Sequence, residues 1–185
     1  MTWVRTGRST FDTESSWEEG DTTMAAAIIS VQQVKPMLDL LQEAASIELT
    51  VSQHYWARAA YWRGFGVKKL VEMYEKEAEE ERGHAKLVTD RAVFLGKQPT
   101  LEPDKEAPTQ GSLREQMTQD LAGEVVVADR YVAWVKVALD AGDFVTMNIF
   151  KQILKETEAH VDWLQGQLKI AGELGDELFL ARWVD

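Results

Sequence analysis

The chain has no cysteine among its 185 residues, and this absence excludes several kinds of site. Without thiolates there is no disulfide, no cysteine-ligated zinc and no iron–sulfur cluster, which leaves carboxylates and imidazoles for metal chemistry. The sequence also lacks any apolar run of the roughly 20 residues that a membrane-spanning helix needs. No basic segment followed by an apolar stretch opens the chain, so we expect no secretory signal and a cytoplasmic location.

Proline, glycine and basic residues are scarce as well. The chain has four prolines and twelve glycines, which suits long helices with few breaks. Lysine and arginine number 20 against 31 aspartates and glutamates, a net charge of −11. That balance argues against nucleic acid or a membrane surface as the partner. The composition therefore predicts one all-α domain.

Apolar residues recur at helical spacing in four long stretches. We expect helices over residues 34–63, 67–95, 112–139 and 143–171. Ser112 and Asp143 are suited to the N-caps of the third and fourth helices. Apolar residues between 178 and 183 predict a short fifth helix.

The segment 96–111 between the second and third helices carries three of the prolines and is long for a connection. Extended, it could span about 50 Å, which is enough to return along a helix of about 43 Å. Two helix pairs joined by such a crossover are the connectivity of the ferritin-like antiparallel four-helix bundle. We assign residues 31–185 to this domain.

Residues 1–30 differ from the rest of the chain. They mix small polar and acidic residues with Trp3, Phe11 and Trp17 and show no sustained period. We expect an extended or flexible arm. An alternative is that the three aromatic side chains dock on a neighbouring surface or subunit.

One metal-binding pattern occurs once in full and once as a near-copy with one ligand missing. A glutamate is followed further along by a Glu-x-x-His pair, whose side chains lie on one face of a helix. Four-helix proteins that hold two irons use two such pairs and two single glutamates. The chain fills five of the six positions, with Glu48, Glu81, His84, Glu124 and His160. Thr157 stands at the sixth, where a carboxylate is expected.

Counting from the interhelical turns places these candidates at one level. Glu48 and Glu81 lie 17 and 16 residues from Phe65 in the first turn, while Glu124 and His160 each lie 18 residues from the second. A single Glu-x-x-His is usually part of a solvated face. All five candidates are in phase with the apolar stripes, however, and buried carboxylates are costly unless they are paired or bind a metal.

Four segments with this spacing resemble the bacterioferritins. They are Ile47–Tyr55, Glu81–Ala85 with Phe94–Gly96, Asp120–Glu124, and Ile153–Lys155 continuing through His160–Leu164. The likeness covers about residues 34–182, and the tail after Gly175 resembles the family's fifth helix. It implies a homo-oligomeric hollow cage of 24 subunits, with 12 as the alternative, and a di-iron ferroxidase centre in each subunit.

The resemblance also implies roles for the ligands. Glu48 and His84 would be terminal ligands of one iron, and Glu124 and His160 those of the other. Glu81 would bridge both irons.

Two further aromatic residues match the family, and two positions differ from it. Tyr55 and Trp163 match aromatic residues beside the centre that could supply an electron, although both also fill core space. Arg82 stands where haem-binding subunits carry the methionine that ligates haem, so we expect no haem bound in this way. Thr157 replaces the second bridging carboxylate.

The implied function is iron storage and detoxification, with Fe(II) oxidised by dioxygen or peroxide. Because Thr157 provides no bridging carboxylate, we expect weaker or asymmetric metal binding. A solvent oxygen, Glu156 or Glu158 could substitute for the missing oxygen donor. One alternative is a cage or iron-binding subunit with impaired ferroxidase activity. Another is a di-metal peroxidase or catalase, which the lack of extra domains and the fifth helix oppose. The same ligands also accept manganese and zinc.

Overall fold

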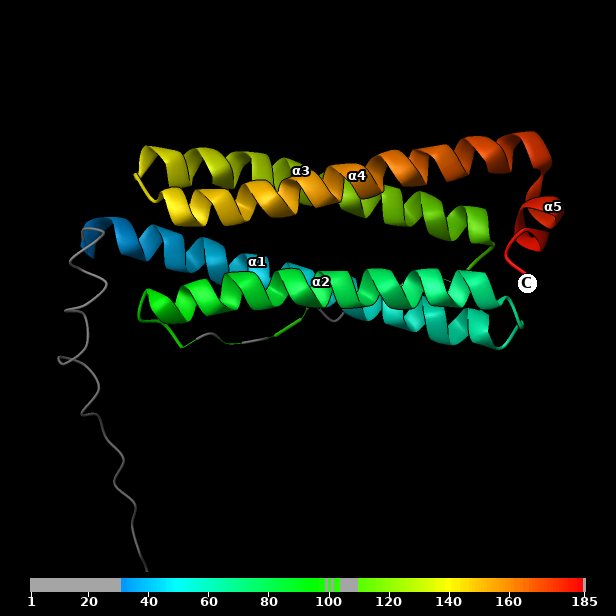
Figure 1. The fold of residues 1–185 in the computed structure, drawn as a ribbon, viewed down its shortest axis with the longest axis horizontal. Helices are drawn as coiled ribbons and strands as arrows, with labels where there is room; N and C mark the ends of the chain where they lie inside the picture. Colours follow the sequence, from blue (N-terminus) through cyan, green and yellow to red (C-terminus); the bar gives the residue numbers. More distant parts are fainter. Residues whose placement is uncertain (1–30, 99, 101, 104–109, 185) are drawn as a thin grey trace, which may run out of the picture.

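Four long helices run side by side along the bundle, and a short fifth helix lies across one end (Figure 1). The computed structural model describes residues 31–98, 100, 102–103 and 110–184; the predicted arm of residues 1–30, with its three aromatic residues, lies outside this part. The helices are α1 (Val31–Arg63), α2 (Lys68–Phe94), α3 (Leu113–Asp140), α4 (Phe144–Leu174) and α5 (Asp176–Ala181). No helix in the described residues is long and apolar enough to cross a membrane.

The expected all-α bundle is confirmed, and most helix ends lie within a residue or two of their predicted positions. One larger difference is the end of α4, which continues through Gly172 to Leu174. A single glycine inside a helix costs only about 1 kcal/mol. The helix ends at Gly175, whose φ of 75° few other residues adopt.

Both predicted caps are present. Ser112 and Glu115 form a capping box in which each side chain accepts a hydrogen bond from the other residue's backbone N–H. Asp143 accepts from the N–H of Thr146, 3.0 Å away, at the start of α4. These bonds satisfy backbone donors that have no partner within the helix.

The helices form two pairs, with α1 packed mainly against α2 and α3 against α4. The chain leaves α2 at one end of the bundle and begins α3 at the opposite end, which confirms the long crossover (Figure 1). Within the crossover, the backbone N–H of Thr100 donates to Gln42 Oε1 over 2.9 Å. This bond holds part of the connection beside α1.

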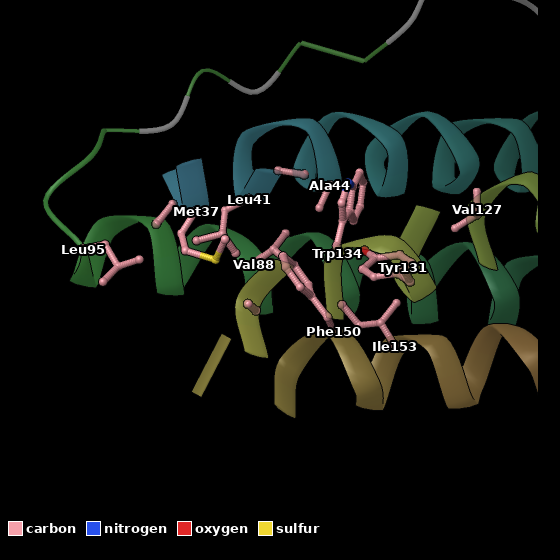
Figure 2. Close-up of a cluster of buried hydrophobic side chains, with 13 residues drawn as sticks. Met37, Leu41, Ala44, Val88, Leu95, Val127, Tyr131, Trp134, Phe150 and Ile153 are labelled. Carbon is pink, nitrogen blue, oxygen red and sulfur yellow. The ribbon is translucent and has the colours of Figure 1, made fainter. Parts of the chain in front are cut away.

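The apolar core consists of two clusters, one toward each end of the bundle. Figure 2 shows the first cluster, to which all four long helices contribute, among them Met37 and Leu41 from α1, Val88 from α2, Tyr131 from α3 and Phe150 from α4. The second cluster lies toward the end where α5 packs and includes Tyr55, Leu70, Met117, Leu164 and Phe179. The middle of the bundle is therefore free for a polar layer.

Two buried ion pairs connect elements that the chain does not join directly. Arg58 of α1 donates to Asp120 of α3 over 2.7 Å, and both side chains are at most 5% exposed. Asp120 also accepts from the Tyr74 hydroxyl at 3.2 Å. Near the opposite end, Arg91 of α2 donates to the capping carboxylate of Asp143 over 2.7 Å.

The Arg58–Asp120 pair gives the first prediction. Asp120→Ala leaves a buried guanidinium without its carboxylate, so we expect a loss of about 3–5 kcal/mol in the free energy of unfolding. Replacing both residues with apolar ones, as Arg58→Met with Asp120→Leu, recovers most of that loss. Chemical denaturation of the metal-free protein measures both changes. Asp129→Ala, at an exposed position of the same helix, is the control, and an equal loss in that variant contradicts the assignment.

Candidate metal centre

The predicted ligands lie in the polar layer between the two apolar clusters. Glu48, Glu81, His84 and Glu124 are buried, with exposed fractions between 1% and 6%. His160 is slightly more open, with a side chain that is 10% exposed. In each long helix these residues fall between the stretches that enter the two clusters. The level deduced from turn counting is therefore the level of the layer.

Glu48, Glu81 and His84 form the tightest group of candidate ligands. His84 Nδ1 lies 2.8 Å from Glu81 Oε2 and 3.4 Å from Glu48 Oε2. One ligand atom from each of the three residues lies within 4.8 Å of the others. Two carboxylates and one imidazole so placed could hold one divalent cation.

Glu124 and His160 meet through a tyrosine. The Tyr55 hydroxyl donates to Glu124 Oε1 and lies 3.1 Å from His160 Nε2. The ring of Tyr55 also stacks on Tyr74, with centroids 5.9 Å apart. Among the described residues, Glu124 and His160 belong to no group of three converging metal ligands. The second half of the centre therefore has fewer converging donors than the first.

Thr157 lies in the layer at the sixth ligand position, where it is 4% exposed. Its hydroxyl donates to the backbone carbonyl of Ile153 over 3.0 Å. A hydroxyl used in this way offers no anionic oxygen to a cation. Thr157 therefore lies at the position that the spacing predicted, and its hydroxyl bonds the backbone of its own helix.

The two predicted aromatic residues both touch His160. Tyr55 does so through its hydroxyl, and Trp163 stacks on the imidazole with centroids 5.6 Å apart and an interplanar angle of 17°. Trp163 in turn meets Trp183 edge to face at 6.2 Å. Arg82 is exposed, and its side chain bonds Glu79 of the same helix over 2.6 Å.

Three contacts were not anticipated from the sequence. Glu77 Oε2 lies 3.1 Å from His160 Nδ1, Glu156 Oε2 lies 2.8 Å from His84 Nε2, and the Tyr131 hydroxyl donates to Glu48. Each imidazole therefore contacts a carboxylate from the facing helix. Glu77 lies four residues before Glu81, on the same helix face, a spacing that could have drawn attention to it.

Burial and neighbouring carboxylates raise the pKa values of two buried carboxyl groups, Glu81 and Glu124. Burial raises the pKa of Glu124 to about 7, against the lowering effect of the His160 charge. Burial likewise raises the pKa of Glu81, and Glu48 adds to the effect despite the hydrogen bond from His84. The metal-free layer is therefore short of positive charge.

The pKa values of the two imidazoles are also raised, although burial acts on them in the opposite direction. Burial lowers the pKa of His84, but its hydrogen bonds with Glu48 and Glu81 outweigh that effect and raise the pKa to about 11. Burial also lowers the pKa of His160, while the hydrogen bond with Glu77 and the Glu124 charge raise it overall. Protons on the imidazoles thus supply part of the charge that a metal ion could supply.

The donor set suits iron. Carboxylate oxygens and imidazole nitrogens are ligands that both Fe(II) and related divalent ions accept. A cation placed between Glu48 and Glu81 also removes the repulsion that raises the Glu81 pKa. The residues present therefore fit a metal ion in the first half of the layer.

Comparison with known proteins places this chain in a family. A model of the ferritin-like domain matches residues 38–171, and the chain belongs to the ferritin-like family. Curated relatives are bacterioferritins. That of Mycolicibacterium paratuberculosis is 32% identical over 148 residues, which cover 80% of this chain and 93% of the relative. That of Rhodobacter capsulatus is 30% identical over 143 residues, covering 77% and 89%.

Solved bacterioferritin structures have the same fold. BfrA of Mycobacterium tuberculosis is similar with a TM-score of 0.78 and 29% identity, over 81% of this chain and 94% of that one. The Rhodobacter capsulatus bacterioferritin has a TM-score of 0.77 and 29% identity, over 80% and 92%. That structure is described with a metal-free dinuclear site and a haem iron. The resemblance seen in the sequence segments is confirmed.

The raised pKa values predict how metal affinity depends on pH. His84, with a pKa of about 11, carries a proton throughout pH 6–8 and must lose it to bind a metal, so affinity should rise about tenfold per pH unit. Glu124, with a pKa of about 7, adds a second proton at the acidic end. Zn(II) titrations at pH 6, 7 and 8 measure the slope, and His54→Gln should leave it unchanged. A pH-independent affinity contradicts the prediction.

Proposed function

We propose that this protein stores and detoxifies iron by oxidising Fe(II) at a two-metal centre inside each subunit of a multi-subunit cage. The observation that carries the proposal is the buried convergence of Glu48, Glu81 and His84 at the level of Glu124 and His160. The bacterioferritin relatives, which cover four fifths of the chain, support iron storage in a ferritin-like cage.

Fe(II) is the substrate in this proposal. Each ion gives one electron to dioxygen or peroxide and leaves as Fe(III), which hard carboxylate oxygens stabilise. Glu48 and His84 hold one ion, Glu124 and His160 hold the other, and Glu81 lies between the two sets. Glu48, Glu81 and Glu124 are buried away from bulk water, which strengthens the attraction of these carboxylates for a cation.

The side chains around the ligands fix their orientation. Glu156 accepts from one nitrogen of His84, which leaves the other nitrogen to face Glu48 and Glu81. Tyr131 donates to Glu48 and Tyr55 donates to Glu124, so each carboxylate keeps one oxygen bound. We propose that Tyr55 and Trp163, which both contact His160, supply electrons when fewer than two Fe(II) ions are present.

Aerobic addition of Fe(II) to the purified protein tests the function. We expect ferric absorbance to develop faster than in buffer, and a large particle before and after loading. Glu81→Gln keeps the side-chain volume but removes the shared charge, and should slow oxidation at least about tenfold, or 1.4 kcal/mol of barrier. Glu79→Gln, an exposed change on the same helix, should not. A monomeric particle that oxidises iron at the buffer rate refutes the proposal.

A second candidate is a cage subunit with an impaired centre. The observation favouring it is Thr157, whose hydroxyl bonds Ile153 where a bridging carboxylate is expected. Thr157→Glu restores the bridge and should accelerate Fe(II) oxidation severalfold if its absence limits the reaction. Thr157→Gln introduces a side chain of nearly the same size as glutamate but without its charge, so it separates the effect of the charge from that of the added volume. Equal rates in the native chain and both variants show that the missing bridge does not limit activity.

The aromatic residues can be tested separately. Tyr55→Phe removes the hydroxyl that joins Glu124 to His160, so we expect slower oxidation and loss of a tyrosyl radical signal in rapid-freeze spectroscopy at low Fe(II). Trp163→Phe should remove a tryptophanyl signal while leaving metal stoichiometry unchanged. Tyr61→Phe, at a partly exposed position of α1, is the control, and a radical signal lost there as well contradicts the assignment.

A further inference from the structure

A hollow of about 480 Å³ lies on the surface between α2 and α4, beside the buried layer. Its lining includes Lys76 and His160 together with four carboxylates, Glu72, Glu77, Glu80 and Glu156. The carboxylates outnumber the one lysine. The hollow therefore presents an acidic surface that includes His160, and Glu156 on its wall contacts His84.

A second group of candidate ligands lies at this hollow. Ligand atoms of Glu80, His84 and Glu156 lie within 4.8 Å of one another. Glu156 Oε2 is 2.8 Å from His84 Nε2, and Glu80 is one turn before His84 on α2. The glutamate side chains are 38% and 36% exposed, whereas that of His84 is 5% exposed. The group thus joins the surface to the buried layer.

Glu156 bonds the nitrogen of His84 that the buried carboxylates leave unbonded. It contacts Nε2 of His84, whereas the buried carboxylates Glu48 and Glu81 contact Nδ1. The imidazole ring therefore lies between Glu156 and the two buried carboxylates. One side chain, His84, faces a different pair of carboxylates with each of its nitrogens.

Because both groups of ligands share the His84 imidazole, only one of them can use it to bind a cation at a time. A neutral imidazole has one protonated nitrogen and one nitrogen with a free lone pair, so it can ligate from only one of them. With a cation among Glu48, Glu81 and Nδ1, the proton is on Nε2 and is donated to Glu156. With a cation among Glu80, Glu156 and Nε2, the proton is on Nδ1 and is donated to Glu81.

We propose that Glu80, Glu156 and His84 Nε2 form an outer site for a divalent cation, and that His84 serves this site and the buried group in turn. The oxygen and nitrogen donors suit Fe(II), Mn(II) or Zn(II). Lys76 Nζ, 3.4 Å from Glu80, has to move away when the site fills; its side chain is 72% exposed and is free to do so. Use of the site to load Fe(II) rests on the proposed function.

Zn(II) is the probe, because it cannot be oxidised at the centre. Crystals of the assembled protein soaked in Zn(II) at neutral pH should show anomalous peaks at both groups, with occupancies that sum to no more than one per His84. The Glu80→Gln and Glu156→Gln double variant should lose the outer peak and keep the buried one. Glu79→Gln with Asp162→Asn changes exposed residues of the same two helices and should keep both peaks.

Any other distribution of the zinc peaks contradicts a specific part of the proposal. A buried peak without an outer one in the native protein excludes the outer site and leaves the proposed function standing. An outer peak that persists in the double variant refutes the assignment of its ligands, and occupancies that sum above one refute the alternation at His84. Absence of zinc from both groups overturns the outer site and the proposed metal centre together.

Discussion

The structure depends on keeping charged groups buried at the middle of an apolar bundle. An isolated buried carboxylate is costly, and this layer holds Glu48, Glu81 and Glu124 at 6% exposure or less. Tyrosine hydroxyls and protonated imidazoles offset part of that cost, but the pKa values of Glu81 and Glu124 stay raised. A cation would complete the compensation, so the burial of these carboxylates, which is costly for the fold, is also what would favour a bound cation.

Ion pairs outside the layer hold the helices at the register that the layer needs. Asp120 lies one turn before Glu124 on α3, and Arg58 lies one turn after Tyr55 on α1. The Arg58–Asp120 pair therefore fixes α1 against α3 next to the contact between Tyr55 and Glu124. At the other end, Arg91 of α2 forms an ion pair with Asp143, the N-cap residue of α4. Apolar packing alone would tolerate small axial shifts that these directional contacts oppose.

Turn counting found the layer because antiparallel helices translate sequence distance into height. It placed Glu48 beside Glu81 and Glu124 beside His160, and the contacts through His84 and Tyr55 agree. It could not find Glu77 or the contact of Glu156 with His84, since carboxylates on partly exposed helix faces are common and side-chain direction depends on the facing helix. The end of α4 was also missed, because the sequence does not show that the helix ends at Gly175 rather than at Gly172 until the φ of Gly175 is known.

The departure at Thr157 makes the two halves of the layer chemically different. The half around His84 has two buried carboxylates at Nδ1 and a partly exposed carboxylate at Nε2, whereas the half around His160 has Glu124, held by Tyr55, and Glu77 on the hollow side. A bridging carboxylate at position 157 would add negative charge to both halves. Without it, the carboxylates gather around His84, and α2 supplies more of the anionic oxygen available to a cation than α4 does.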